Sequence, residues 1–209
     1  MKPLAHSLRA QLHLYIFVSV LFLVGVVFGA LLVNALTLEQ QQDIGSHIGH
    51  FFTTIDQDGA SANGGEVFLD SALFYLKWIA VIALLGISIV GFPIVLALVF
   101  AKGVFVGFTV GTLVGQYAWK GALFALVSVA PHNMIAIPLI MIASVASMAF
   151  AMHVLKHRLF MPKLQSLREP IGRFCALQAS AALGMGAVAA VVTWISPGLM
   201  KWAAPFLIG

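Results

Sequence analysis

The chain has 209 residues, of which 61% are hydrophobic and 9% charged, and its mean hydropathy is +1.04. A soluble domain is about one quarter charged, so this composition excludes a water-soluble fold and identifies an integral membrane protein. The formal net charge is +4, and the single cysteine, Cys175, excludes an intrachain disulfide or a cysteine metal cluster.

Charge is distributed unevenly along the chain. Six of the seven acidic residues lie in residues 37–75, which contain no Lys or Arg, and five of the eleven basic residues lie in residues 153–173. Under the positive-inside rule, the basic connector 153–173 is cytoplasmic and the acidic loop 37–75 is extracytoplasmic. The asymmetry therefore predicts membrane topology rather than nucleic-acid binding.

The first predicted span covers residues 14–36. This segment is uncharged and about 34 Å long as a helix, enough to cross a hydrocarbon core of about 30 Å. It is longer than the core of a signal peptide and lacks a small-residue cleavage site, so we expect it to be retained. Gly25 and Gly29 form a GxxxG motif, which predicts a helix-packing face.

The acidic loop opens with Thr37, which can cap a short helix. Apolar residues at helical spacing make this segment amphipathic, and we expect it to lie on the outer membrane surface or against the bundle. His47 and His50 fall on one helical face, but a zinc site needs further ligands, so the sequence predicts no metal site.

Two further spans are predicted at residues 76–100 and 103–118. Pro93 should kink the first of them, and Lys102 should mark the cytoplasmic boundary between them. The second is short for a straight crossing, so a re-entrant helix is the alternative. It carries glycine at every fourth position, a row that allows close helix packing in lipid: Gly103, Gly107, Gly111 and Gly115.

Residues 121–152 contain no charge and are too long for one crossing. Pro131 and Pro138 divide the segment, which predicts a fourth span broken at Pro131-His132-Asn133, with the break facing the bundle interior. A fifth span is expected at residues 174–195. The sequence thus predicts one all-α membrane domain, residues 1–209, with about five transmembrane helices, a cytoplasmic N-terminus and an extracytoplasmic C-terminus.

His132 is the ionisable side chain expected deep within an apolar run. It fits a functional role, as part of an ion path, proton relay or partner contact, and equally a structural role in satisfying backbone freed by Pro131. Asn133 has the same two interpretations. No predicted span holds a carboxylate well inside it, and no catalytic or phosphate-binding motif is present, so we expect neither an enzyme nor a bound cofactor.

Three stretches carry a family resemblance: HLYIFVSVLFLVGVVFGALLVN, GISIVGFPIVLALVFAKGVFVGFTVGTLVGQ and LVSVAPHNMIAIPLIMIASVAS. Together they resemble the stage II sporulation protein M family of endospore-forming Firmicutes. The wider family often has Pro-His-Gly followed by an acidic residue, whereas this chain has Asn133 and then Ala136. A role that depends on a His–carboxylate pair therefore does not carry over.

The resemblance implies a non-enzymatic scaffold in the septal and engulfing membrane of the mother cell. Its implied partners are two membrane-anchored peptidoglycan hydrolases, stage II sporulation proteins P and D, and wall degradation by that complex would drive engulfment. The glycine faces and the 37–75 loop are the candidate contact surfaces for this role.

Two alternatives remain open from the sequence. The first is a transporter or permease built around the broken fourth span and His132. The second is a small assembly or lipid-binding protein whose basic connector, residues 153–173, contacts anionic headgroups. A homo-oligomer is compatible with each of these functions.

Overall fold

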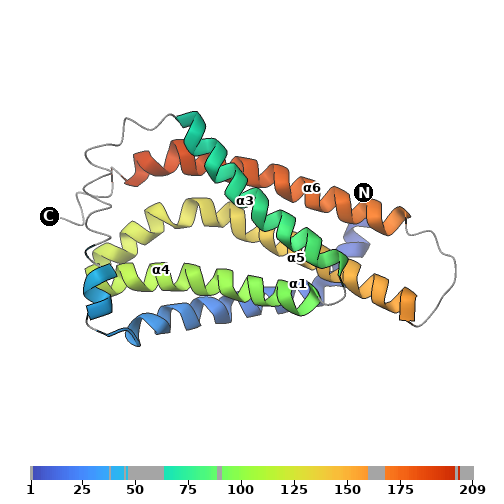
Figure 1. The fold of residues 1–209 in the computed structure, drawn as a ribbon, viewed down its shortest axis with the longest axis horizontal. Helices are drawn as coiled ribbons and strands as arrows, with labels where there is room; N and C mark the ends of the chain where they lie inside the picture. The colour runs from blue at the N-terminus through green and yellow to red at the C-terminus, as the bar shows by residue number, and fades with distance from the viewer. Residues whose placement is uncertain are drawn as a thin grey trace.

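The computed structural model describes residues 2–37, 39–44, 46, 64–88, 91–159, 168–200 and 202. Its named elements, in chain order, are α1 (Lys2–Asn34), α3 (Gly64–Ile87), α4 (Gly91–Ser128), α5 (Ala130–Leu159), α6 (Arg168–Ala190) and the π-helical turn η1 (Val191–Ile195). No strand occurs in this described part of the chain, which confirms the predicted all-α fold. The helices run side by side along one long axis, with α3 inclined across the others (Figure 1).

Five helical stretches are long and apolar enough to cross a membrane, which agrees with the predicted number of spans. They are Leu12–Asn34, Gly64–Ile87, Gly91–Ser128, Ala130–Leu155 and Pro170–Met200.

The bundle has two ends, which we name by the charge of the nearby sequence. At the acidic end, α1 finishes, residues 39–44 form a short helical stretch and α3 begins (Figure 1). At the basic end, α3 and α5 finish and α4 and α6 begin (Figure 1).

The boundary predicted at Lys102 is wrong. The second span, α3, already begins at Gly64 and ends at Ile87, and α4 runs from Gly91 straight through Lys102. The chain turns between α3 and α4 near Gly91, whose amide donates to the Ser88 carbonyl at 3.0 Å. A Cβ at Gly91 would overlap the Leu85 carbonyl, so the close approach of the chain at this turn requires glycine. Pro93 then lies in the first turn of α4, where its missing N–H has no helical acceptor to lose.

Helix α4 consists of two arms that meet at Ala118, whose φ of 48° and ψ of −128° are not helical. The first arm, residues 91–117, runs towards the acidic end, and the second arm, residues 119–128, starts the return (Figure 1). Gly121 lies against the Leu113 carbonyl of the first arm, and a Cβ there would overlap it. The sharp turn at Ala118 therefore depends on glycine at position 121.

The returning segment is broken, as predicted, but the break lies at Val129 rather than at Pro131-His132-Asn133. Val129 is a turn between α4 and α5, and the three predicted residues lie in the first turns of α5. Pro131 fits there because the first turn of a helix has no acceptors for its amides. Pro138 lies inside α5.

The core lies around α5. In the apolar 18-residue window of its membrane-length stretch, 56% of the residues are buried, whereas the same window in the other four stretches reaches at most 28%. Residues 143–148 are all buried, and Val145 and Met148 are fully enclosed against Ile82 of α3 and Met185 of α6. Both ends of the predicted connector 153–173 are helical, because α5 continues to Leu159 and α6 begins at Arg168.

Candidate functional site

The two glycine motifs pack against each other, α1 on the first arm of α4. A Cβ added at any of four glycines would lie closer than 3.0 Å to a carbonyl oxygen of the other helix: Gly25, Gly29, Gly103 and Gly107. At Gly25, for example, it would lie 2.5 Å from the Phe100 carbonyl oxygen. Because real Cβ atoms do not come this close, only glycine permits this contact between backbones. We call this contact the glycine seam.

The two helices of the glycine seam pack less closely towards the acidic end. At Gly111 an added Cβ would still lie 3.0 Å from the Ala30 Cα, but at Gly115 the nearest atom, the Val33 Cγ1, would be 3.7 Å away. The helices therefore separate at the fourth glycine of the row. The sequence predicted both motifs as packing faces, and the structure shows that most of the row is occupied by α1 of the same chain.

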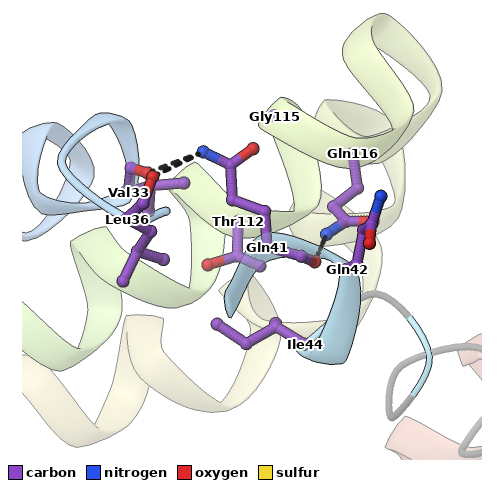
Figure 2. Close-up of a pocket in the computed structure, with 8 residues that line it drawn as sticks. All are labelled: Val33, Leu36, Gln41, Gln42, Ile44, Thr112, Gly115 and Gln116. Carbon is purple, nitrogen blue, oxygen red and sulfur yellow. Dashed lines mark hydrogen bonds between the residues drawn. The ribbon is translucent and has the colours of Figure 1, made fainter. Parts of the chain in front are cut away.

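A polar pocket of about 280 Å³ opens where the seam ends (Figure 2). Three glutamines, Gln41, Gln42 and Gln116, lie around it together with apolar and small residues; the remaining lining residues are Val33, Leu36, Ile44, Thr112 and Gly115.

Hydrogen bonds fix the segment after α1 onto α4 at this pocket. The Gln116 side-chain amide donates to the Gln41 carbonyl at 2.6 Å, and the Gln41 side-chain amide donates to the Leu36 carbonyl at 3.2 Å (Figure 2 shows both glutamines). Thr37 caps the short helix reciprocally: the Gln40 amide donates to the Thr37 Oγ1 at 3.3 Å, and the Thr37 amide donates to the Gln40 Oε1 at 3.0 Å. The predicted cap is confirmed.

A second polar group lies on α4 and α5. The Asn133 Nδ2 donates to the Val129 carbonyl at 2.9 Å and lies 3.1 Å from the His132 Nε2. Lys102 of α4 is close enough to His132 to act on it electrostatically. The Asn133 Oδ1 is buried without a hydrogen-bond partner, as is the His132 Nδ1. We call Lys102, His132 and Asn133 the polar cluster.

Sequence reasoning found two members of this cluster and missed Lys102. The sequence places this lysine at a membrane boundary if Pro93 is a kink within a span. Had Gly91 and Pro93 been interpreted as a turn followed by a helix start, Lys102 would have fallen near the middle of the next span.

Metal-ligating residues do not gather in the described part of the chain: no group of three His, Cys, Asp or Glu is found there. His47 and His50 lie outside the described residues. Cys175 is a free, exposed thiol on α6.

Comparison with known proteins gives one result that bears on identity. The family model of stage II sporulation protein M matches residues 18–197, which include the glycine seam, the polar pocket and the polar cluster. No curated protein and no solved structure matches the chain. The match extends over most of the 209 residues, and the chain therefore belongs to the stage II sporulation protein M family.

Proposed function

We propose that the chain is a non-enzymatic membrane scaffold that recruits membrane-anchored peptidoglycan hydrolases, stage II sporulation proteins P and D, to the septal and engulfing membrane. The observation that carries this proposal is the family match over residues 18–197. The five membrane-length helices and the sporulation family both fit a multi-pass membrane protein.

The proposal gives the two ends of the bundle different roles. The basic end faces the cytoplasm, as the basic residues between 153 and 173 require, and the acidic end faces the cell wall. The hydrolases then meet the chain at the acidic end, where a segment without Lys or Arg offers carboxylates to basic partner surfaces.

The geometry of the polar pocket supports this assignment. Gln116 ties the start of the acidic segment to α4 through the Gln41 carbonyl, and the glycine seam holds α1 against the same helix. A segment anchored in this way loses less conformational entropy when a partner binds, because part of it is already ordered.

Co-purification tests the proposal. The tagged chain, solubilised in mild detergent from sporulating cells, should recover both hydrolases. Gln116→Leu, which removes the donor to Gln41, should lower the recovery several-fold while the chain itself still inserts. Ser180→Ala on α6 is the matched control, since it removes an exposed polar group far from the pocket in sequence. Absence of both hydrolases from the wild-type eluate would contradict the scaffold role.

A further inference from the structure

Lys102 is a cation within a membrane-spanning helix. It lies about 17 Å along the helix axis from Gly91, where α4 begins, which is near mid-depth for a hydrocarbon core of about 30 Å. A charge at this depth is unfavourable by several kcal/mol unless another group compensates it.

The described chain offers no carboxylate at that depth. The acidic side chains that the structure describes belong to Glu39, Asp43, Glu66 and Asp70. The first two follow α1, and the other two lie in the first two turns of α3, so all four belong to the acidic end. Lys102 thus has no acidic partner among the described residues of its own chain.

Its described neighbours do not compensate the charge either. His132 is at best neutral, and the buried Asn133 donates to the Val129 carbonyl while its Oδ1 has no partner. Asn133 is only 6% exposed, so a bare acceptor there is unfavourable by about 1–3 kcal/mol. The cluster therefore has one uncompensated cation and one unused buried acceptor.

An apolar groove of about 340 Å³ begins beside this cluster, between α4 and α5. Val106 and Val110 line it, and they lie one and two helical turns beyond Lys102 on the same face of α4. Asn133 also lines it, which brings the unused acceptor to the groove. Three other lining residues are small, Ala122, Ala125 and Ala130, and let a further helix approach closely, while larger apolar side chains complete the lining: Leu126, Val129, Met134 and Ile137.

We propose that this groove binds a transmembrane helix of a partner protein, and that a single Asp or Glu near the middle of that helix pairs with Lys102. An apolar helix surface fills the groove, the carboxylate compensates the cation, and a donor on the same helix reaches the Asn133 Oδ1. The inference rests on the proposed scaffold role, because it defines the chemistry of one partner span.

The described part of a second copy of this chain offers no carboxylate that fits the site. Its span carboxylates, Glu66 and Asp70, lie about 3 and 9 Å from the start of α3, far from mid-depth, and Glu169 lies at the start of α6. An anionic lipid headgroup does not fit either, because the site lies in the hydrocarbon region rather than at the interface.

Model peptides test the site without the natural partners. The full chain, labelled at its single cysteine Cys175 and reconstituted in phosphatidylcholine vesicles, is titrated with labelled Leu/Ala transmembrane peptides that carry Glu, Gln or Leu at the centre. Energy transfer should show the Glu peptide binding at least about tenfold more tightly than the other two. Equal binding of the three peptides by the wild-type chain would overturn the inference.

Variants assign the effect to Lys102. Lys102→Gln should remove the preference for Glu, whereas Lys120→Gln should keep it, because Lys120 has an exposed side chain beside the Ala118 turn at the acidic end rather than at mid-depth. Lys102→Glu should in turn prefer a Lys-centred peptide. Energy transfer between copies of the chain without peptide, lost in Lys102→Gln, would instead show a second copy in the groove and contradict the proposal.

The peptide-binding test of the groove and the co-purification test of the scaffold role can fail independently of each other. If the hydrolases co-purify but no peptide shows a Glu preference, the groove inference fails alone. If the Glu preference is found but the hydrolases do not co-purify, the groove binds an acidic span and the hydrolase assignment fails.

Discussion

Gly107 is where a single added methyl group should matter most for the α1–α4 contact. A Cβ there would overlap the Val26 carbonyl and lie closer than 3.0 Å to the Val26 Cα, both of which are backbone atoms that cannot rotate away. Gly107→Ala should therefore push α1 from α4 and lower the free energy of unfolding by about 1–3 kcal/mol. Denaturation of the full chain in mixed detergent micelles measures this change.

Gly186 of α6 provides the matched control, because nothing lies within 4 Å of a Cβ built there. Gly186→Ala adds the same methyl group to a helical glycine, and it should leave the free energy of unfolding unchanged or raise it by up to about 1 kcal/mol. Equal effects of the two substitutions would show that the glycine seam is not closely packed.

At the scale of single residues, the sequence predicts which residues form a packing face but not which residues they contact. The spacing of Gly103, Gly107 and Gly111 predicts a smooth helix face, because period and side-chain size are local properties. Lys102 was misplaced because a proline within an apolar run is compatible with a kink or with a helix start, and only the turn at Gly91 decides between them.

Three helices of the bundle are joined by one buried hydrogen-bond chain. The Gln178 side chain of α6 donates to the Ser147 Oγ at 2.8 Å and to the Ala143 carbonyl at 3.0 Å, both on α5. Ser147 in turn donates to the Ile82 carbonyl of α3 at 3.0 Å. This chain holds α3 and α6 against the central helix, because a polar group in lipid that loses its partner has no water to replace it.

A double-mutant cycle with Gln178→Ala and Ser147→Ala measures that link. Each single variant should lower stability, and the interaction energy between the two sites should be about 0.6–2 kcal/mol. The pair Gln178→Ala and Ser180→Ala is the control, since Ser180 donates to the carbonyl of Leu177 on its own helix. Additive effects at Gln178 and Ser147 would contradict the network.

The number and class of the helices could be predicted from hydropathy and length, but their pairing could not. Gly25 and Gly103 lie far apart in the sequence, and either motif alone fits many partners. The position of the break in the returning segment was close but not correct, because Pro131 prevents a helix from running through it yet is well suited to starting one. The Val129 turn, just before that helix, carries no distinctive residue.

At the scale of the whole molecule, five membrane-length helices form one bundle, and the acidic segment begins at one end of it. The glycine seam and the Gln178 network fix the helices, and Gln116 fixes the beginning of the acidic segment. The proposed orientation rests on the basic residues between 153 and 173, which the positive-inside rule assigns to the cytoplasmic side. Contact with wall hydrolases is then expected at the acidic end and not at the basic end.

Site-specific photo-crosslinking in sporulating cells tests this claim most directly. A photoreactive residue in place of Gln42, which is exposed and lines the polar pocket, should capture a peptidoglycan hydrolase, and one in place of Arg173, exposed near the start of α6, should not. Capture from Arg173 alone, or none from Gln42 when the hydrolases are present, would contradict a scaffold that holds its enzymes at the acidic end.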